Sequence, residues 1–299
     1  MEKIIFTNVL GSFVFDENLR FIEKGEEKAL MNKHKAREST IKQSKIILSN
    51  FKSKEYFEEF YKKNLVITKK GLKNSVKEDL LVTQTISLIK EQTRVINTLV
   101  KRLREWYEIY NPEFSKSVHD HESFVKLIIK KDKKELLKEI KIDEKNTMGA
   151  DLEKRDLEPM MELAKEMEYL FKAKEKQTEY LEDLMKRTCP NVNEIAGAVI
   201  GAELINLAGS LKKLAEMPSS TIQLLGAEKA LFRHMRTGAK VPKHGILIQH
   251  PLMAKTKKEI HGKVARALAD KISIAAKVDY FKGKFVADKL KKMLEEKFS

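Results

Sequence analysis

The sequence predicts a mainly α protein with a small N-terminal α/β module, a long antiparallel coiled-coil hairpin and an all-α C-terminal domain. Residues 72–148 contain no glycine, whereas residues 197–283 contain eight of the twelve glycines. Apolar residues in the middle of the chain recur in alternating steps of three and four, as in long helices. The first 25 residues instead alternate apolar and polar side chains, as strands do. We expect the three parts to span 1–70, 71–190 and 191–299.

The N-terminal module begins with three predicted antiparallel strands. Apolar residues alternate around Gly11 and Gly25, and residues 16–18 have the composition of a turn. From 39 to 63 the spacing of apolar residues predicts one or two helices that cover one face of this sheet. We expect the module to end near Gly71.

Two segments of the middle third carry a heptad seam, one within 82–110 and one within 160–184. The members we assign to the seam are Ile89, Ile96, Leu99, Leu103, Trp106, Met160, Leu163, Met167, Leu170, Leu181 and Leu184. Helices of about 30 to 35 residues rise 1.5 Å per residue and form a rod of roughly 50 Å. Such a rod spaces two domains, pairs with a second copy of the chain or docks another partner. The lysine-rich residues 117–150 predict short helices that cap its tip.

The charge balance indicates an anionic partner. The chain has 59 basic and 44 acidic side chains, a net charge of +15, and such a field concentrates polyanions such as nucleic acids. Cys189 is the only cysteine, so the chain can form neither an intrachain disulfide nor a thiolate metal cluster by itself. Apolar stretches are too short to span a membrane, and the first residues do not resemble a secretory leader. We therefore expect a cytoplasmic protein without a membrane partner.

The basic charge is concentrated between residues 226 and 266. This segment has two acids and ten basic residues: Lys229, Arg233, Arg236, Lys240, Lys243, Lys255, Lys257, Lys258, Lys263 and Arg266. His234, His244, Gln249 and His250 lie among them. Basic groups attract phosphate, while imidazole and amide groups can stack on or bind unpaired bases. Gly226 lies at a predicted helix start, where free amides also favour phosphate. The competing interpretation is a generic basic surface with structural histidines.

Motifs for catalysis are weak in this sequence. It has neither the phosphate-binding pattern G-x-x-x-x-G-K-[ST] nor G-x-G-x-x-G after a strand. His119, His121 and Glu122 lie close together, but their spacing favours solvated polar residues over a metal site. We expect no catalytic residue, no metal and no cofactor. An RNA-modifying enzyme that uses His234, His244 or His250 as a general base is a remote alternative.

The run LGAEKALFRHMRTGAKVPKHGILIQHP, residues 225–251, resembles the signature of the Nop-domain family. Residues 188–229 before it, KISIAAKVDYFKG after it and REWYEIYNPEF at 104–114 are also similar to this family, so the resemblance covers about 80–285. It is strongest to the archaeal core scaffold proteins of box C/D small ribonucleoproteins, relatives of the eukaryotic nucleolar Nop proteins. Met235 and Val241 depart from the pattern, and the first 70 residues match it weakly.

This resemblance implies a non-catalytic scaffold for RNA-guided 2'-O-methylation of rRNA or tRNA. The N-terminal module would bind fibrillarin, a methyltransferase that uses S-adenosylmethionine, and the coiled coil would pair two copies. The Nop domain would bind a box C/D guide RNA together with its small kink-turn-binding protein. The implied contact residues are Gly226, Ala227, Glu228, Lys229, Arg233, His234, Arg236, Lys240, Lys243, His244, Gln249 and His250. A spliceosomal-type Nop protein without a methyltransferase partner is the alternative.

Overall fold

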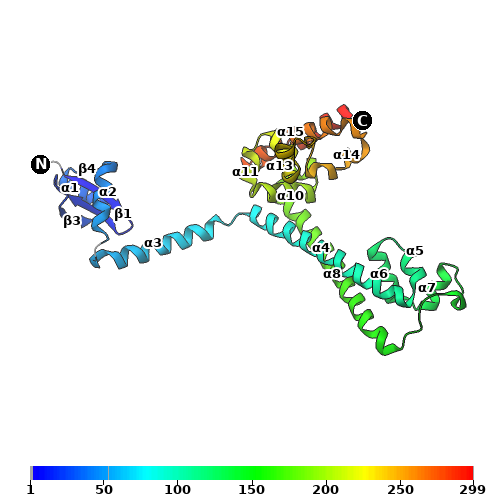
Figure 1. Ribbon diagram of the computed structural model, residues 1–299. Helices are drawn as coiled ribbons and strands as arrows, with labels where there is room; N and C mark the ends of the chain where they lie inside the picture. Colours follow the sequence, from blue (N-terminus) through cyan, green and yellow to red (C-terminus); the bar gives the residue numbers. More distant parts are fainter. Residues whose placement is uncertain (1–2, 53, 299) are drawn as a thin grey trace. The chain divides into compact units, whose positions relative to one another are not determined.

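The structure is a computed structural model that describes residues 3–52 and 54–298 (Figure 1). The chain divides between Lys77 and Glu78 into two compact units, which we call unit 1 and unit 2. Unit 1 is a small α/β module and unit 2 is helical. The predicted fold class is confirmed: the chain is mainly α, with a small N-terminal α/β module.

Unit 1 contains a four-stranded sheet. Its strands are β1 (Ile4–Asn8), β2 (Gly11–Phe15), β3 (Phe21–Gly25) and β4 (Arg37–Glu38), in the order β3-β2-β1-β4. The three predicted strands are present and pair antiparallel, while the short β4 adds a parallel partner to β1.

Helices cover both faces of this sheet because β1 and β2 direct buried side chains alternately to the two faces. On one face Phe13 packs with Ile47 of α2 (Ile41–Asn50) and with Phe51, ahead of α3 (Lys54–Ser75). On the other face Val14 packs with Leu30 of α1 (Glu27–His34). The sequence patterns predicted the first layer but not α1. Helix α3 also continues past Gly71, where we expected the module to end, to Ser75.

Unit 2 begins with a hairpin of two long helices, α4 (Glu78–Tyr110) and α8 (Lys154–Thr188). Between them lie the short helices α5 (Pro112–Ser117), α6 (His121–Lys130), α7 (Lys133–Glu139) and the 3-10 turn η1 (Glu144–Asn146). Pro190 then opens a series of shorter elements: α9 (Pro190–Ala196), α10 (Ala198–Ala208), α11 (Leu211–Glu216), α12 (Ser219–Leu224), α13 (Glu228–Thr237), η2 (Ile246–Gln249), α14 (Pro251–Lys255), η3 (Lys258–Ile260), α15 (His261–Tyr280) and α16 (Ala287–Phe298).

The hairpin seam lies partly along the predicted residues. Its buried members from the prediction are Ile89, Ile96, Leu103, Met160, Met167, Leu181 and Leu184. Leu99, Trp106, Leu163 and Leu170 lie at the edge of the core, and the neighbouring Val100, Tyr107 and Ala164 are buried instead. The shift arises because tip helix α6 packs against α8 and its Phe124 contacts Tyr107 of α4, which brings residues one position further round into the core.

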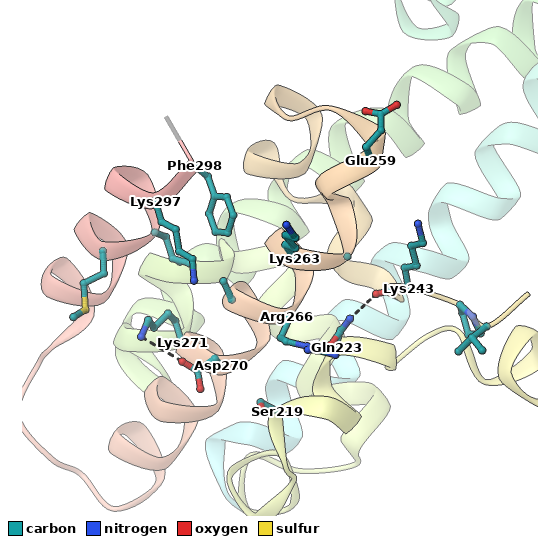
Figure 2. A pocket seen from close by; sticks show the side chains of 16 residues that line it. Ser219, Gln223, Lys243, Glu259, Lys263, Arg266, Asp270, Lys271, Lys297 and Phe298 are labelled. Atoms are coloured by element: carbon teal, nitrogen blue, oxygen red, sulfur yellow. Dashed lines mark hydrogen bonds and ion pairs between the residues drawn. The ribbon is translucent and has the colours of Figure 1, made fainter.

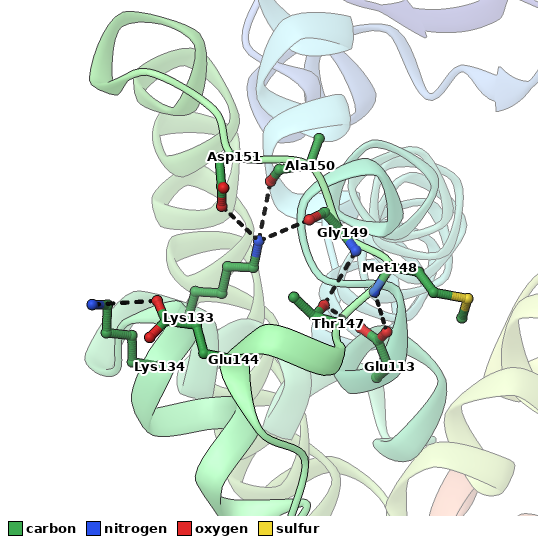
Figure 3. A network of polar contacts seen from close by, with 9 residues as sticks. All are labelled: Glu113, Lys133, Lys134, Glu144, Thr147, Met148, Gly149, Ala150 and Asp151. Carbon is green, nitrogen blue, oxygen red and sulfur yellow. Dashed lines mark hydrogen bonds and ion pairs between the residues drawn. The ribbon is translucent and has the colours of Figure 1, made fainter.

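A buried lysine holds the tip of the hairpin together (Figure 3). The Lys133 side chain is 7% exposed, and its Nζ donates to the carbonyl oxygens of Gly149 and Ala150 at 3.1 Å each. The same Nζ lies 3.4 Å from an Asp151 carboxylate oxygen and 4.8 Å from the Tyr110 ring centroid. These contacts fasten the chain entering α8 to the end of α4. The short helices expected within 117–150 are therefore part of a compact tip.

The shorter C-terminal helices pack onto the base of the hairpin as part of the same compact unit. Helix α10 lies against both α4 and α8, and Lys90 of α4 forms an ion pair with Glu203 of α10. The carboxylate of Asp79 also accepts a hydrogen bond from the Leu211 amide at 3.1 Å. The expected boundary at 190/191 thus falls inside unit 2, at the start of α9.

Candidate nucleic-acid interface

Unit 2 has a hollow of about 1010 Å³ with a basic lining. Helix α12, the loop before Gly245, helix α15 and the end of α16 line it. Its basic side chains are Lys243, Lys263, Arg266, Lys271 and Lys297, and its acids are Glu259 and Asp270. Lys271 forms an ion pair with Asp270 at 3.3 Å, which leaves an excess of basic charge. We call this hollow the basic groove (Figure 2).

The chain builds one wall of this groove by fastening a loop to the end of α12. The Gln223 side-chain amide donates to the Lys243 carbonyl oxygen at 2.6 Å, and the Gly245 amide donates to the Gln223 carbonyl oxygen at 2.8 Å. A Cβ atom at Gly245 would lie 1.8 Å from the Leu225 carbonyl oxygen, so only glycine fits there. Figure 2 shows the Gln223–Lys243 bond with Arg266 close beside it. The loop is thereby held with Lys243 facing the groove.

Helix α13 lies in the basic segment and presents its side chains to solvent. None of its residues is buried, and Lys229, Arg233 and Arg236 are all exposed. Phe232 and Met235 are 65% and 73% exposed. A helix that buries no apolar residue and presents both cations and large apolar side chains has the properties of a binding surface.

The predicted glycine-to-lysine turn before α13 has a different geometry from the one we expected. Helix α13 begins at Glu228, and Gly226 lies before it with a φ of 85°, where a side chain would be strained. The Gly226 amide donates to a Glu228 carboxylate oxygen at 2.7 Å. That amide is therefore satisfied within the chain instead of being free for a phosphate. Ala227 is half-buried and Lys229 is exposed.

Two predicted histidines have structural roles. The Nε2 of His250 donates to the Ile195 carbonyl oxygen at 2.9 Å, and its Nδ1 accepts from the Leu252 amide at 3.1 Å. Burial lowers the pKa of His250, so the ring is held neutral. His234 Nδ1 bonds to the Ala239 carbonyl oxygen at the end of α13. These rings position the loop, and their contact with RNA remains a prediction.

The remaining predicted residues lie around the groove and its entrance. His244 is half-buried, its ring centroid is 6.0 Å from that of His261, and burial lowers its pKa. Lys240 and Gln249 are exposed on the flanking loops. The sequence reasoning did not select Lys263, Arg266, Lys271 or Lys297 as site residues. The first two could have been found, since a spacing of three on a predicted helix places them on one face.

Searches for other kinds of site give two findings. Within residues 3–52 and 54–298, His, Cys, Asp and Glu form no group of three or more that could hold a metal ion. In the same described part, no helix has both the length and the apolar character needed to cross a bilayer.

Comparison with known proteins gives the family. The family model "Nop: snoRNA binding domain, fibrillarin" matches residues 88–299. An uncharacterized NOP5 family protein from Methanocaldococcus jannaschii is 42% identical over 81% of this chain and 63% of its own length. Nucleolar protein 56 from Homo sapiens is 32% identical over 74% of this chain and 41% of its own length. The chain thus spans less than two thirds of these relatives.

A solved structure of a fibrillarin/Nop5p complex aligns with 98% of this chain and 98% of the matched chain, at 23% identity and a TM-score of 0.48. The resemblance deduced from residues 225–251 is confirmed by the family match, which includes the basic groove and α13. Because that match covers more than half of the sequence, the chain belongs to the Nop family of snoRNA-binding domains.

Proposed function

We propose that this chain is a non-catalytic scaffold of an archaeal box C/D ribonucleoprotein. It bridges fibrillarin to guide RNA bound by the kink-turn protein, for RNA-guided 2'-O-methylation of rRNA or tRNA. The scaffold itself carries no cofactor, and the methyltransferase partner uses S-adenosylmethionine. The observation that carries the proposal is the basic groove, which is lined in part by the loop that follows α13 and lies inside the part of the chain that matches the snoRNA-binding family.

The groove and α13 supply two different kinds of contact. Lys243, Lys263 and Arg266 offer charge to the phosphates of a folded RNA, and such contacts position the RNA without reading its sequence. The exposed Phe232 and Met235 on α13 are apolar side chains, which pack against other apolar groups and do not bind phosphates. We therefore assign α13 to a composite surface made by the RNA and the small protein bound to it.

Pairing of two copies needs a surface other than the hairpin seam, because α4 and α8 bury that seam within one chain. Helix α4 carries a second apolar series with steps of seven, in which Leu81, Leu88 and Val95 are exposed. Arg102 interrupts the series, and the exposed Ile109 follows it. A repeat of seven is the period with which helices pair in coiled coils. We propose that this outer series forms the interface of a homodimer.

Unit 1 is proposed to bind the methyltransferase. Helix α3 exposes Phe57, Tyr61, Leu65 and Leu72, which share one face of the helix by their steps of four and seven. The rings of Phe57 and Tyr61 stack at a centroid distance of 6.0 Å. An exposed apolar face of this size favours a protein partner. Holding the enzyme and the RNA on one chain raises the local concentration of enzyme at the target nucleotide.

A gel shift tests the RNA-binding part of this proposal. The full chain is titrated against kink-turn RNA alone and against the same RNA carrying its small kink-turn-binding protein. We expect tight binding only to the binary complex, because the groove offers few groups that read bases. Equal affinity for the two probes would contradict the composite surface.

A further inference from the structure

The loop that joins α15 to α16, residues 281–285, exposes two aromatic rings beside two lysines. Phe281 and Phe285 are 77% and 51% exposed, and Lys282, Gly283 and Lys284 between them are exposed as well. Within the described residues neither ring belongs to the core of unit 2. Nor does either lysine form an ion pair there. Phe281 packs edge-on against Tyr280 at a centroid distance of 5.0 Å, and the other apolar and cationic groups of the loop are open to solvent.

The loop is held rigidly at both ends by one pair of buried side chains. Asp279 accepts hydrogen bonds from the Asn191 side chain at 2.7 Å and from the Val192 amide at 2.9 Å. The Asn191 side-chain oxygen in turn accepts from the amides of Val286 and Ala287 at 2.8 and 3.0 Å. Asn191 is 2% exposed. The exposed rings thus stand on a fixed base.

The backbone at the start of the loop forms the cap of α15. Lys282 has a φ of 53°, its amide donates to the Asp279 carbonyl oxygen at 3.2 Å, and the Gly283 amide donates to the Val278 carbonyl oxygen at 2.8 Å. A left-handed residue with these two bonds is a common way to end a helix. The cap fixes the path of the backbone that carries Phe281 and Lys282.

We infer that the 281–285 loop is a second RNA contact, which takes an unpaired stretch of RNA by stacking bases on Phe281 and Phe285 while Lys282 and Lys284 contact phosphates. Alternating aromatic and cationic groups match the alternation of base and phosphate in a single strand. The loop follows the last residue of α15, and about 15 Å of helix, at 1.5 Å per residue, separates Phe281 from Lys271, the last α15 residue that lines the groove. It is therefore distinct from the basic groove. This inference rests on the proposed RNA-binding function of the chain.

The test compares two RNA probes, both bound by the small kink-turn-binding protein. One ends at the kink-turn stem and the other continues into an unpaired extension of about ten nucleotides, enough for one stacking site. Fluorescence anisotropy gives the affinity of the full chain for each. We expect the extension to strengthen binding by the unchanged chain. The Phe281→Ala/Phe285→Ala variant loses that gain, which amounts to about tenfold or more for each stacked base.

Control variants separate the loop from the groove. Arg266→Ala weakens binding to both probes and leaves their ratio unchanged, whereas Tyr169→Ala, which removes an exposed ring of helix α8, changes neither. The Phe281→Trp/Phe285→Trp variant keeps the gain in affinity that the extension gives. Its two added indoles fluoresce in addition to Trp106, and only the extended probe quenches this added fluorescence. Wild-type stability in the alanine variant, checked by thermal unfolding, excludes misfolding.

The outcomes are distinguishable. If the double alanine variant keeps the full gain from the extension, the loop is not an RNA contact even though the groove is. If Arg266→Ala weakens neither probe, the proposed function itself fails. Co-sedimentation with phosphatidylserine vesicles completes the test: vesicle binding that the same alanine variant abolishes, with an unchanged probe ratio, would assign the loop to a lipid surface and overturn the inference.

Discussion

Unit 2 contains two lysine-rich regions, the hairpin tip and the basic segment 226–266, and their lysines differ in how they are paired. In the tip, four of the eight lysines of 117–150 form an ion pair with a carboxylate, namely Lys126, Lys131, Lys133 and Lys134. In the basic segment, the ten lysines and arginines form no ion pair within the described residues. The difference teaches that charge pairing, and not lysine content, marks the surface that is left for an anionic partner.

Removing charge from the basic segment gives the largest expected effect. We expect Lys229→Ala/Arg233→Ala/Lys243→Ala to weaken assembly with kink-turn RNA and its small protein by about a thousandfold at low salt, near 4 kcal/mol. The slope of log affinity against log salt concentration should fall by about one unit or slightly less for each side chain. Gel shifts over a salt series measure both quantities.

The tip provides the matched control. Lys126→Ala/Lys131→Ala/Lys134→Ala also removes three lysines, but these are already paired with acids on the surface. It should leave the salt slope nearly unchanged. An equal loss of slope in both triple variants would mean that the comparison between the regions is wrong.

The second effect is on stability and concerns the buried tip lysine. Lys133→Met removes three polar contacts, and the carbonyl oxygens of Gly149 and Ala150 lose the donor that Lys133 provides. We expect the free energy of unfolding to fall by about 3 kcal/mol, because hydrogen bonds to a charged group are stronger than neutral ones. Urea unfolding measures this change.

Lys134→Met is the control, since its ion pair with Glu144 is exposed and should contribute at most a few tenths of a kcal/mol. If both variants lost the same stability, the Lys133 network would be an ordinary surface interaction.

The third effect extends the comparison to apolar residues. If the outer series of α4 pairs two copies, Leu88→Glu/Val95→Glu should weaken self-association at least about tenfold, near 1.4 kcal/mol. Sedimentation velocity over a concentration series detects the shift from dimer to monomer. Met148→Glu, at an exposed residue of the tip, should leave the dimer intact, and a wild-type dimer in both variants would remove α4 from the interface.

The smallest effect is a pH dependence from His250. Burial lowers its pKa below the ordinary value of 6.5, so below that pH the unfolded chain takes up a proton before the folded chain does. This contribution to stability is complete above pH 6.5 and is lost as the pH falls toward the folded pKa. The free energy of unfolding should decline from pH 7.5 to 5.5, and His250→Gln should flatten that decline.

His119→Gln, on the tip segment, provides the comparison for a histidine outside the core. It should leave the wild-type decline unchanged. If the chemical shift of the His250 ring changed on RNA binding and His250→Gln left the stability unchanged, His250 would instead belong to the RNA-binding surface.

Periodicity and glycine distribution predicted the fold class, the three strands and the two long helices, because these depend on local patterns. The covering helix α1 was missed, since only Leu30 of its eight residues is buried and its amphipathic pattern is weak. The seam shifted from Leu99 to Val100 because packing against tip helix α6 is a tertiary effect. Where a third helix packs beside a helical pair, the heptad repeat alone does not predict which residues face the core.

The candidate site divides in the same way. Residue types and the family resemblance located the basic segment, but they could not separate binding side chains from those that hold the loop. The His250 imidazole and the Gly226 amide form hydrogen bonds within the chain itself. Conversely, Lys271 and Lys297 join the groove from residues outside the basic segment. Only the folded chain brings those residues together.

The most direct test of the scaffold is multi-angle light scattering on a mixture of this chain, fibrillarin, the small kink-turn-binding protein and a box C/D RNA, with each component omitted in turn. We predict one stable particle that contains the methyltransferase and loses it when this chain is left out. A particle that never retains the methyltransferase, while the chain still binds the RNA complex, would contradict the bridging role and favour a Nop protein of spliceosomal type.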